Sequence, residues 1–205
     1  MSVAGEPIEN VSDQIERWQH ADGPRTVGSL VELFGEKSFA VIFVLLLGVP
    51  ALPLPTGGAT HVFELIAMLL ALQLIVGRRS VWLPQRWCRL RLEGPKRERF
   101  VRGLLRMIRR LERFSRPRLP WLFGNRASNA VFGLIVLLLS IGAFVAPPFT
   151  GLDTLPALGA VLVSLGVLLD DLAIVVGGVV VGAGGVVLEA VLGRAAFTGI
   201  KSLFS

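Results

Sequence analysis

Cysteine and histidine are scarce in this sequence, and several familiar motifs are missing. Cys88 is the only cysteine, so a single chain can form neither a disulfide framework nor a cysteine-based metal site. The two histidines, His20 and His61, lie far apart in the sequence, which excludes a histidine-rich metal site. There is no Walker phosphate loop, no dinucleotide-binding glycine pattern and no HExxH motif. We therefore expect no cofactor, no metal ion and no enzymatic activity.

Apolar residues, in contrast, are abundant. They make up 53% of the 205 residues, which is more than a soluble domain of this size can bury in one core. Five apolar blocks stand out, at residues 39–52, 59–76, 129–147, 152–169 and 172–192. The composition predicts an all-α integral membrane protein built as a helical bundle.

The apolar blocks differ in length. The last three are long enough to cross a bilayer core of about 30 Å, whereas the first reaches only about two-thirds of the required length before Pro50. We expect this first block to be a re-entrant arm. The chain then divides into an N-terminal amphipathic segment 1–37, a membrane hairpin 38–77, a basic loop 78–128, C-terminal membrane helices 129–193 and a tail 194–205. The first 37 residues are polar and acidic, so we expect no cleavable signal peptide.

An internal repeat is suggested by two Pro/Gly-broken turns. The stretch AVIFVLLLGVPALPLPTGG at 40–58 resembles SIGAFVAPPFTGLDT at 140–154, and an apolar block follows each. The match rests on few identities in low-complexity sequence, so coincidence is an equal alternative. As a repeat, it predicts two hairpins whose broken tips face a shared centre. The turn residues are Pro53, Pro55, Thr56, Gly57, Gly58, Pro147, Pro148 and Thr150.

The positive charge is concentrated in one loop. Residues 78–126 hold sixteen of the 21 Lys and Arg residues, which places the loop, and with it the N-terminus, in the cytoplasm. Apolar residues recur there at helical spacing and predict an amphipathic helix. Its basic face comprises Arg102, Arg106, Arg109, Arg110 and Arg113. We expect the helix to bind the anionic headgroups of the inner leaflet; the alternative is that it packs under the bundle, and nucleic-acid binding is not expected.

Ionisable side chains inside apolar helices are costly and often mark a pathway. Glu64 follows His61 at i,i+3 spacing, so the two groups can share a proton on one helix face, and Gln73 lies further along the same block. Asp153 occupies a comparable position in the second half. These four residues are the predicted substrate or ion pathway. The alternatives are that His61 and Glu64 lie at the membrane interface and that Asp153 caps a helix.

A family resemblance covers roughly residues 29–169. The segments SLVELFGEKSF, VPALPLPTGG, LLALQLIVGRRSVWLP and RLERFSRPRLPW, in this order, resemble the bacterial ExoD family of exopolysaccharide-synthesis membrane proteins. Val81 departs from the pattern, because a proline is expected before Trp82. The resemblance implies an inner-membrane, multi-pass protein that supports exopolysaccharide synthesis or export, and it supplies no catalytic residue.

Two functions from different classes fit these observations. The first is a transporter-like bundle with Glu64 and His61 at its polar centre, plausible as a homodimer because the chain is small for alternating access. The second is a non-transporting accessory or scaffold that docks on the polysaccharide polymerase or export machinery. Glycines at 177–185 predict close packing between helices or between subunits.

Overall fold

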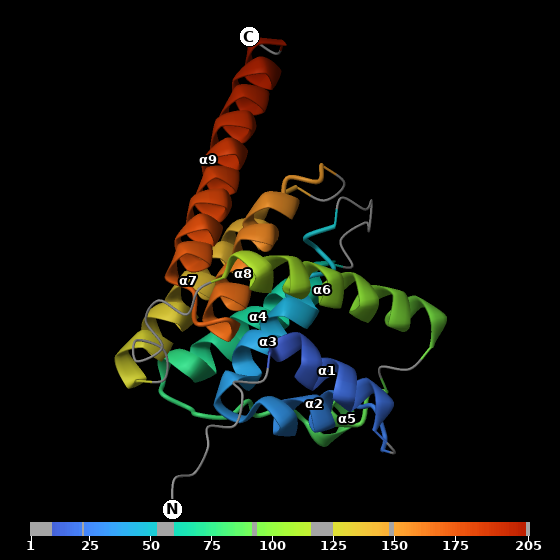
Figure 1. The fold of residues 1–205 in the computed structure, drawn as a ribbon. Helices are drawn as coiled ribbons and strands as arrows, with labels where there is room; N and C mark the ends of the chain where they lie inside the picture. The colour runs from blue at the N-terminus through green and yellow to red at the C-terminus, as the bar shows by residue number, and fades with distance from the viewer. Residues whose placement is uncertain are drawn as a thin grey trace, which may run out of the picture.

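The computed structural model describes residues 10–21, 23–52, 60–91, 94–115, 125–147 and 150–203. Within these ranges the regular structure is helical, and Thr26 and Arg91 form an isolated β-bridge. The prediction of an all-α fold is confirmed for this part of the chain. Figure 1 shows the arrangement, with α9 extending well beyond the other helices.

The helices follow the predicted apolar and amphipathic blocks. They are α1 (Val11–His20), α2 (Val27–Phe34), the short 3-10 helix η1 (Gly35–Lys37), α3 (Ser38–Leu47), α4 (Thr60–Ile75), α5 (Gln85–Cys88), α6 (Pro95–Phe114), α7 (Arg126–Val145), α8 (Thr154–Leu168) and α9 (Leu172–Leu203).

Helix α3 forms the centre of the bundle. It has only ten residues, and most of them, including Phe39, Phe43 and Leu47, are almost completely buried. A helix that is apolar on all sides must be surrounded by other helices, and α3 packs against α2, α4 and α8. At about 1.5 Å per residue, α3 spans only about half of a bilayer core.

Helices α8 and α9 form a tight antiparallel hairpin held by glycines. A Cβ atom on Gly159 would lie 2.4 Å from Cα of Gly182, and one on Gly178 would lie 2.6 Å from the backbone nitrogen of Val163. At both positions only glycine permits this approach of the two backbones. Asp171 precedes α9 and caps its N-terminus, because its Oδ1 accepts a hydrogen bond from the backbone nitrogen of Ala173 at 2.8 Å. The predicted close packing is therefore confirmed within the chain for Gly178, Gly182 and Gly185, whereas Gly177 and Gly184 face open space.

Helices α4 and α7 also pack antiparallel. A Cβ atom on Gly133 of α7 would lie 3.0 Å from the carbonyl oxygen of Ala71 of α4. Further along, the rings of His61 and Phe144 lie 5.1 Å apart between their centroids. These contacts fix the register of the two helices, and the start of α4 therefore lies beside the end of α7.

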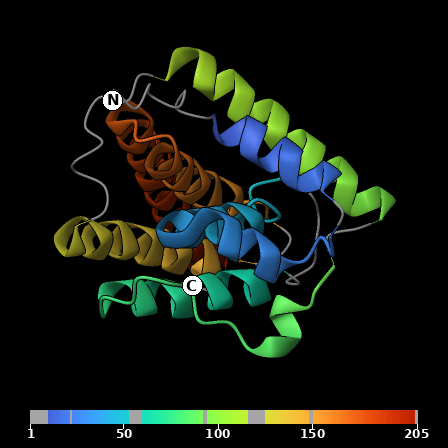
Figure 2. The ribbon, with the colours of Figure 1, turned by 60° about the horizontal axis from the view of Figure 1, so that its bottom comes forward.

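Helix α6 is amphipathic as predicted, but its apolar side is covered by protein. Leu105 and Ile108 are buried in the core, and the helix lies alongside α1 (Figure 2). Glu112 accepts hydrogen bonds from the backbone nitrogen and the hydroxyl group of Ser12 in the first turn of α1, at 3.0 and 2.5 Å, and Arg109 pairs with Glu16. Because Leu105 and Ile108 contact protein, packing against the bundle describes α6 better than insertion of these residues into lipid.

Within the described ranges, two helices are long and apolar enough to cross a membrane. They are α7 and residues 172–194 of α9. Helix α8 has 15 residues, so the expectation that residues 152–169 form a full-length span was wrong. Large apolar side chains are exposed along α4, α7 and α9, among them Leu69, Leu138 and Val187. Such continuous outward apolar faces are typical of contact with lipid and indicate a membrane-associated protein.

Candidate functional site

The centre of the candidate site is the carboxylate of Glu64 on α4. Its side chain is completely buried, and its Oε2 accepts a hydrogen bond from Nδ1 of His61 at 2.9 Å. Its second oxygen, Oε1, has no hydrogen-bond partner. The predicted His61–Glu64 pair is therefore formed.

The start of α8 meets the start of α4 beside this pair. Asp153 occupies the N-cap position of α8, yet its side chain makes no capping hydrogen bond. Its Oδ2 instead accepts a hydrogen bond from the hydroxyl group of Thr60 at 3.4 Å. Thr60 is the first residue of α4, so the helices that follow the two predicted broken turns begin next to each other.

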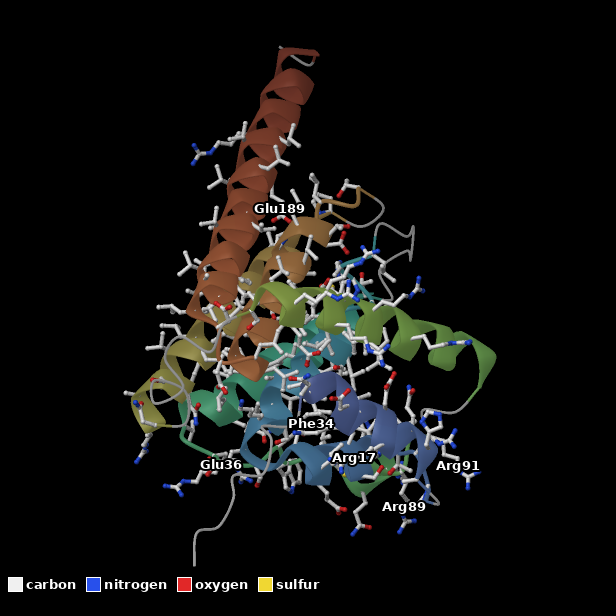
Figure 3. The ribbon with its side chains drawn as sticks, viewed as in Figure 1. Arg17, Phe34, Glu36, Arg89, Arg91 and Glu189 are labelled. Atoms are coloured by element: carbon white, nitrogen blue, oxygen red, sulfur yellow. The ribbon has the colours of Figure 1, made fainter. Side chains whose placement is uncertain are left out.

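Helix α9 adds a carboxylate that the sequence reasoning missed. Glu189 lies one turn after Gly185, which packs against Leu155 and Pro156 at the start of α8 (Figure 3). The carboxyl groups of Glu64, Asp153 and Glu189 therefore lie at the same end of the bundle. The Oε1 atom of Glu189, like that of Glu64, is buried without a hydrogen-bond partner. The signal was present in the sequence, as an acid inside the apolar block 172–192.

The other predicted site residues lie elsewhere or outside the described ranges. The side-chain amide of Gln73 bonds the backbone nitrogen and oxygen of Trp82, at 3.1 and 3.3 Å, and so fixes the segment after α4. Gln73 is nine residues beyond Glu64, about 13 Å along the helix. Thr150 closes a turn by donating to the carbonyl oxygen of Pro147 at 2.7 Å. Outside the described residues lie Pro53, Pro55, Thr56, Gly57, Gly58 and Pro148.

Charged side chains gather at both ends of the bundle. One end, called the acidic end, holds Glu64, Asp153 and Glu189, where α4 and α8 begin and α7 ends. At the opposite end, called the basic end, Lys37 bonds Asp170 at 2.7 Å and the carbonyl oxygen of Leu168 at 3.1 Å. The basic end also carries Arg78, Arg79 and Arg126, of which Arg126 reaches the carbonyl oxygen of Val76, and two further acids, Glu36 and Asp171.

The predicted basic face of α6 is exposed. All five arginines point away from the core, and Arg109 also pairs with Glu16 on α1. The predicted helix and its charged face are thus both formed in the structure. Within the described part of the chain, no three His, Cys, Asp or Glu side chains are grouped so that they could hold a metal ion.

Comparison with known proteins identifies the family. The family described as "Exopolysaccharide synthesis, ExoD" matches residues 10–191, which is most of the chain. An uncharacterized protein of Synechocystis sp., slr1875, is 32% identical over 123 residues, which cover 60% of this chain and 57% of that protein. The chain thus aligns with little more than half of this relative's length. No solved structure matches. This chain belongs to the ExoD family of exopolysaccharide synthesis proteins.

Proposed function

We propose that this protein is a multi-pass inner-membrane protein that supports exopolysaccharide synthesis by moving protons or cations through its acidic end. The main support for this function is the state of Glu64, which is fully buried, with one oxygen bonded by His61 and the other without a hydrogen-bond partner. A carboxylate buried in an apolar helix costs several kcal/mol unless it is neutralised or paired. Such a group is retained where its charge is used, and His61 can exchange a proton with it.

The arrangement of the helices supports a pathway at this point. Helices α4 and α8 both begin at the acidic end, next to Glu64. Helices that are interrupted within the membrane and end at a binding site are a common device of secondary transporters. The short, buried α3 and the following turn form a re-entrant hairpin in this proposal.

An internal repeat is part of the same proposal. In such a repeat, α3 corresponds to α7, and α4 corresponds to α8. A two-fold axis that relates the two halves then turns the α3–α8 contact into the α4–α7 contact. Both contacts are present in the structure. The axis would pass close to the Thr60–Asp153 contact, where the two halves meet.

The proposal includes an orientation. We take the basic end, which carries Lys37, Arg78, Arg79 and Arg126, as the cytoplasmic end, together with the N-terminus, because lysine and arginine next to membrane helices favour the cytoplasm. The acidic end then lies toward the outer side of the membrane. Helix α9 leaves the bundle at the acidic end, so its C-terminal part points outward in this proposal.

A second function, that of a non-transporting accessory, is supported by exposed surfaces on α6 and α9. The arginine face of α6 is exposed, and Gly177 and Gly184 on α9 face open space. A non-transporting accessory would use these surfaces to dock on the polysaccharide polymerase or export machinery, or on a second copy of the chain. The buried Glu64 site would then have no part in function.

Complementation of a strain that lacks its own copy of this protein separates the two functions. Transport predicts that Glu64→Gln abolishes the recovery of exopolysaccharide yield, whereas Glu32→Gln, on an exposed carboxylate, leaves it intact. Reversal of the α6 charges, by Arg106→Glu with Arg110→Glu, should then have little effect. The opposite pattern, with Glu64→Gln tolerated and the reversal inactive at equal protein abundance, would favour the accessory.

A further inference from the structure

We infer that the acidic end binds one desolvated monovalent metal cation of about the size of sodium, between Oε1 of Glu64 and the hydroxyl oxygen of Ser140. This inference deepens the proposed function and rests on it, because it names the ion that the pathway carries. It begins from two buried polar atoms that have no hydrogen-bond partner in the structure.

Ser140 lies on α7 and is completely buried. The α4–α7 register is fixed by the Gly133–Ala71 and Phe144–His61 contacts, which lie on either side of it. Counting inward along the two antiparallel helices places Ser140 opposite Glu64 from the Gly133–Ala71 contact, and the next residue, Ile141, opposite it from the Phe144–His61 contact, so Ser140 lies at the level of Glu64. Ser140 is also one turn before Phe144 and two turns after Gly133, so it shares their face toward α4.

Neither polar atom is satisfied. The hydroxyl oxygen of Ser140 and Oε1 of Glu64 both lack a partner, so they bond neither to each other nor to any other group. The contrast is Ser164 on α8, which is equally buried but donates to the carbonyl oxygen of Ala160 at 2.8 Å. Buried polar groups in native proteins are almost always bonded, so two unbonded oxygens at the same level of two neighbouring helices point to a ligand that completes them.

The chemistry of these oxygens selects the ligand. A carboxylate oxygen and a hydroxyl oxygen are hard donors, which suit alkali and alkaline-earth ions and not soft metals. Glu64 contributes one unit of negative charge, and its other oxygen is held by His61. Glu64 is the only carboxylate among the two proposed ligands, since Asp153 accepts a hydrogen bond from Thr60 and Glu189 lies on α9. One carboxylate ligand matches a monovalent ion, whereas divalent ions usually require several.

The surrounding charges favour a cation at this position. His61, Asp153 and Glu189 are the titratable groups that interact with Glu64, and two of them are carboxylates. Thr60, which is buried, adds a hydroxyl group beside Asp153. A proton on Glu64 is the competing ligand, because it neutralises the same charge.

Binding of radioactive sodium to the purified full-length protein in detergent tests the inference. We expect saturable binding of one ion per chain, competed by unlabelled sodium and not by choline. Glu64→Gln should abolish binding, and Ser140→Ala should weaken it by about 10- to 100-fold, as expected for the loss of one bond to a charged group. Ser164→Ala is the matched control and should bind like the wild type. If Glu64→Gln does not elute as a folded species, Ser140→Ala decides the outcome.

Two results would overturn the inference: no saturable sodium binding by the wild-type protein, or equal loss of binding in Ser140→Ala and Ser164→Ala. The proposed function fails differently. If sodium does not bind but proton flux into vesicles depends on Glu64, the pathway stands and carries protons alone. If sodium binds and no flux occurs, the ion site stands and transport is refuted.

Discussion

The contact between α8 and α9 makes a quantitative prediction for Gly159→Ala. A Cβ atom at this position would lie 2.4 Å from Cα of Gly182 and 2.7 Å from the carbonyl oxygen of Gly178. Ordinary van der Waals contacts of a Cβ atom lie at 3.4–4 Å, so the two helices would have to separate by about 1 Å. Both neighbours are backbone atoms, which cannot move away by changing rotamer.

The expected cost follows from this clash. Overpacking of a well-packed interior costs about 1–3 kcal/mol, and a clash between backbones belongs near the upper limit. For a chain of this length, each kcal/mol lowers the unfolding temperature by about 2–4 °C, so Gly159→Ala should lower it by about 6–12 °C.

Thermal unfolding of the purified protein in detergent, followed by circular dichroism, measures this effect. Gly177→Ala on α9 is the control, because nothing lies within 4 Å of its Cβ position. There, alanine should leave the unfolding temperature unchanged or raise it slightly, since alanine favours a helix over glycine by about 0.5–1 kcal/mol. If Gly159→Ala unfolds within about 2 °C of the wild type, the close α8–α9 packing is refuted.

Two further predictions concern contacts that position helices. Asp171→Ala removes the N-cap of α9 and should cost about 1 kcal/mol, seen as a lower unfolding temperature that Asp171→Asn largely restores; equal losses in both variants would contradict the capping role. Glu112→Ala removes the acceptor for Ser12, so amides of α1 should exchange about 10- to 100-fold faster by hydrogen–deuterium exchange, with α8 unchanged. Unchanged exchange in α1 would show that α6 does not hold it in place.

The sequence was sufficient to predict helices but not what covers them. The spacing of Leu104, Leu105, Ile108 and Leu111 predicts the apolar side of α6 correctly. Lipid and protein interior are equally apolar, so the pattern cannot tell which of the two Leu105 and Ile108 contact. Helix α9 continues to Leu203, beyond its apolar part, and no proline interrupts it.

In the candidate site, too, contacts within one helix could be predicted from the sequence, whereas contacts between helices could not. His61 and Glu64 are on one helix, so their spacing alone predicts their contact. Glu189 and Ser140 reach the same place from other helices, and their arrival depends on the α8–α9 and α4–α7 registers, which the sequence does not specify. Both were detectable only as polar residues inside apolar blocks.

The most direct test of the central claim is ion and proton flux in proteoliposomes that carry the wild-type protein, Glu64→Gln or the exposed-carboxylate control Glu32→Gln, from neutral to alkaline pH. The account predicts flux for the wild type and for Glu32→Gln, and none for Glu64→Gln at equal protein content. Equal flux in all three, or none in any of them, would contradict a pathway through the buried carboxylate.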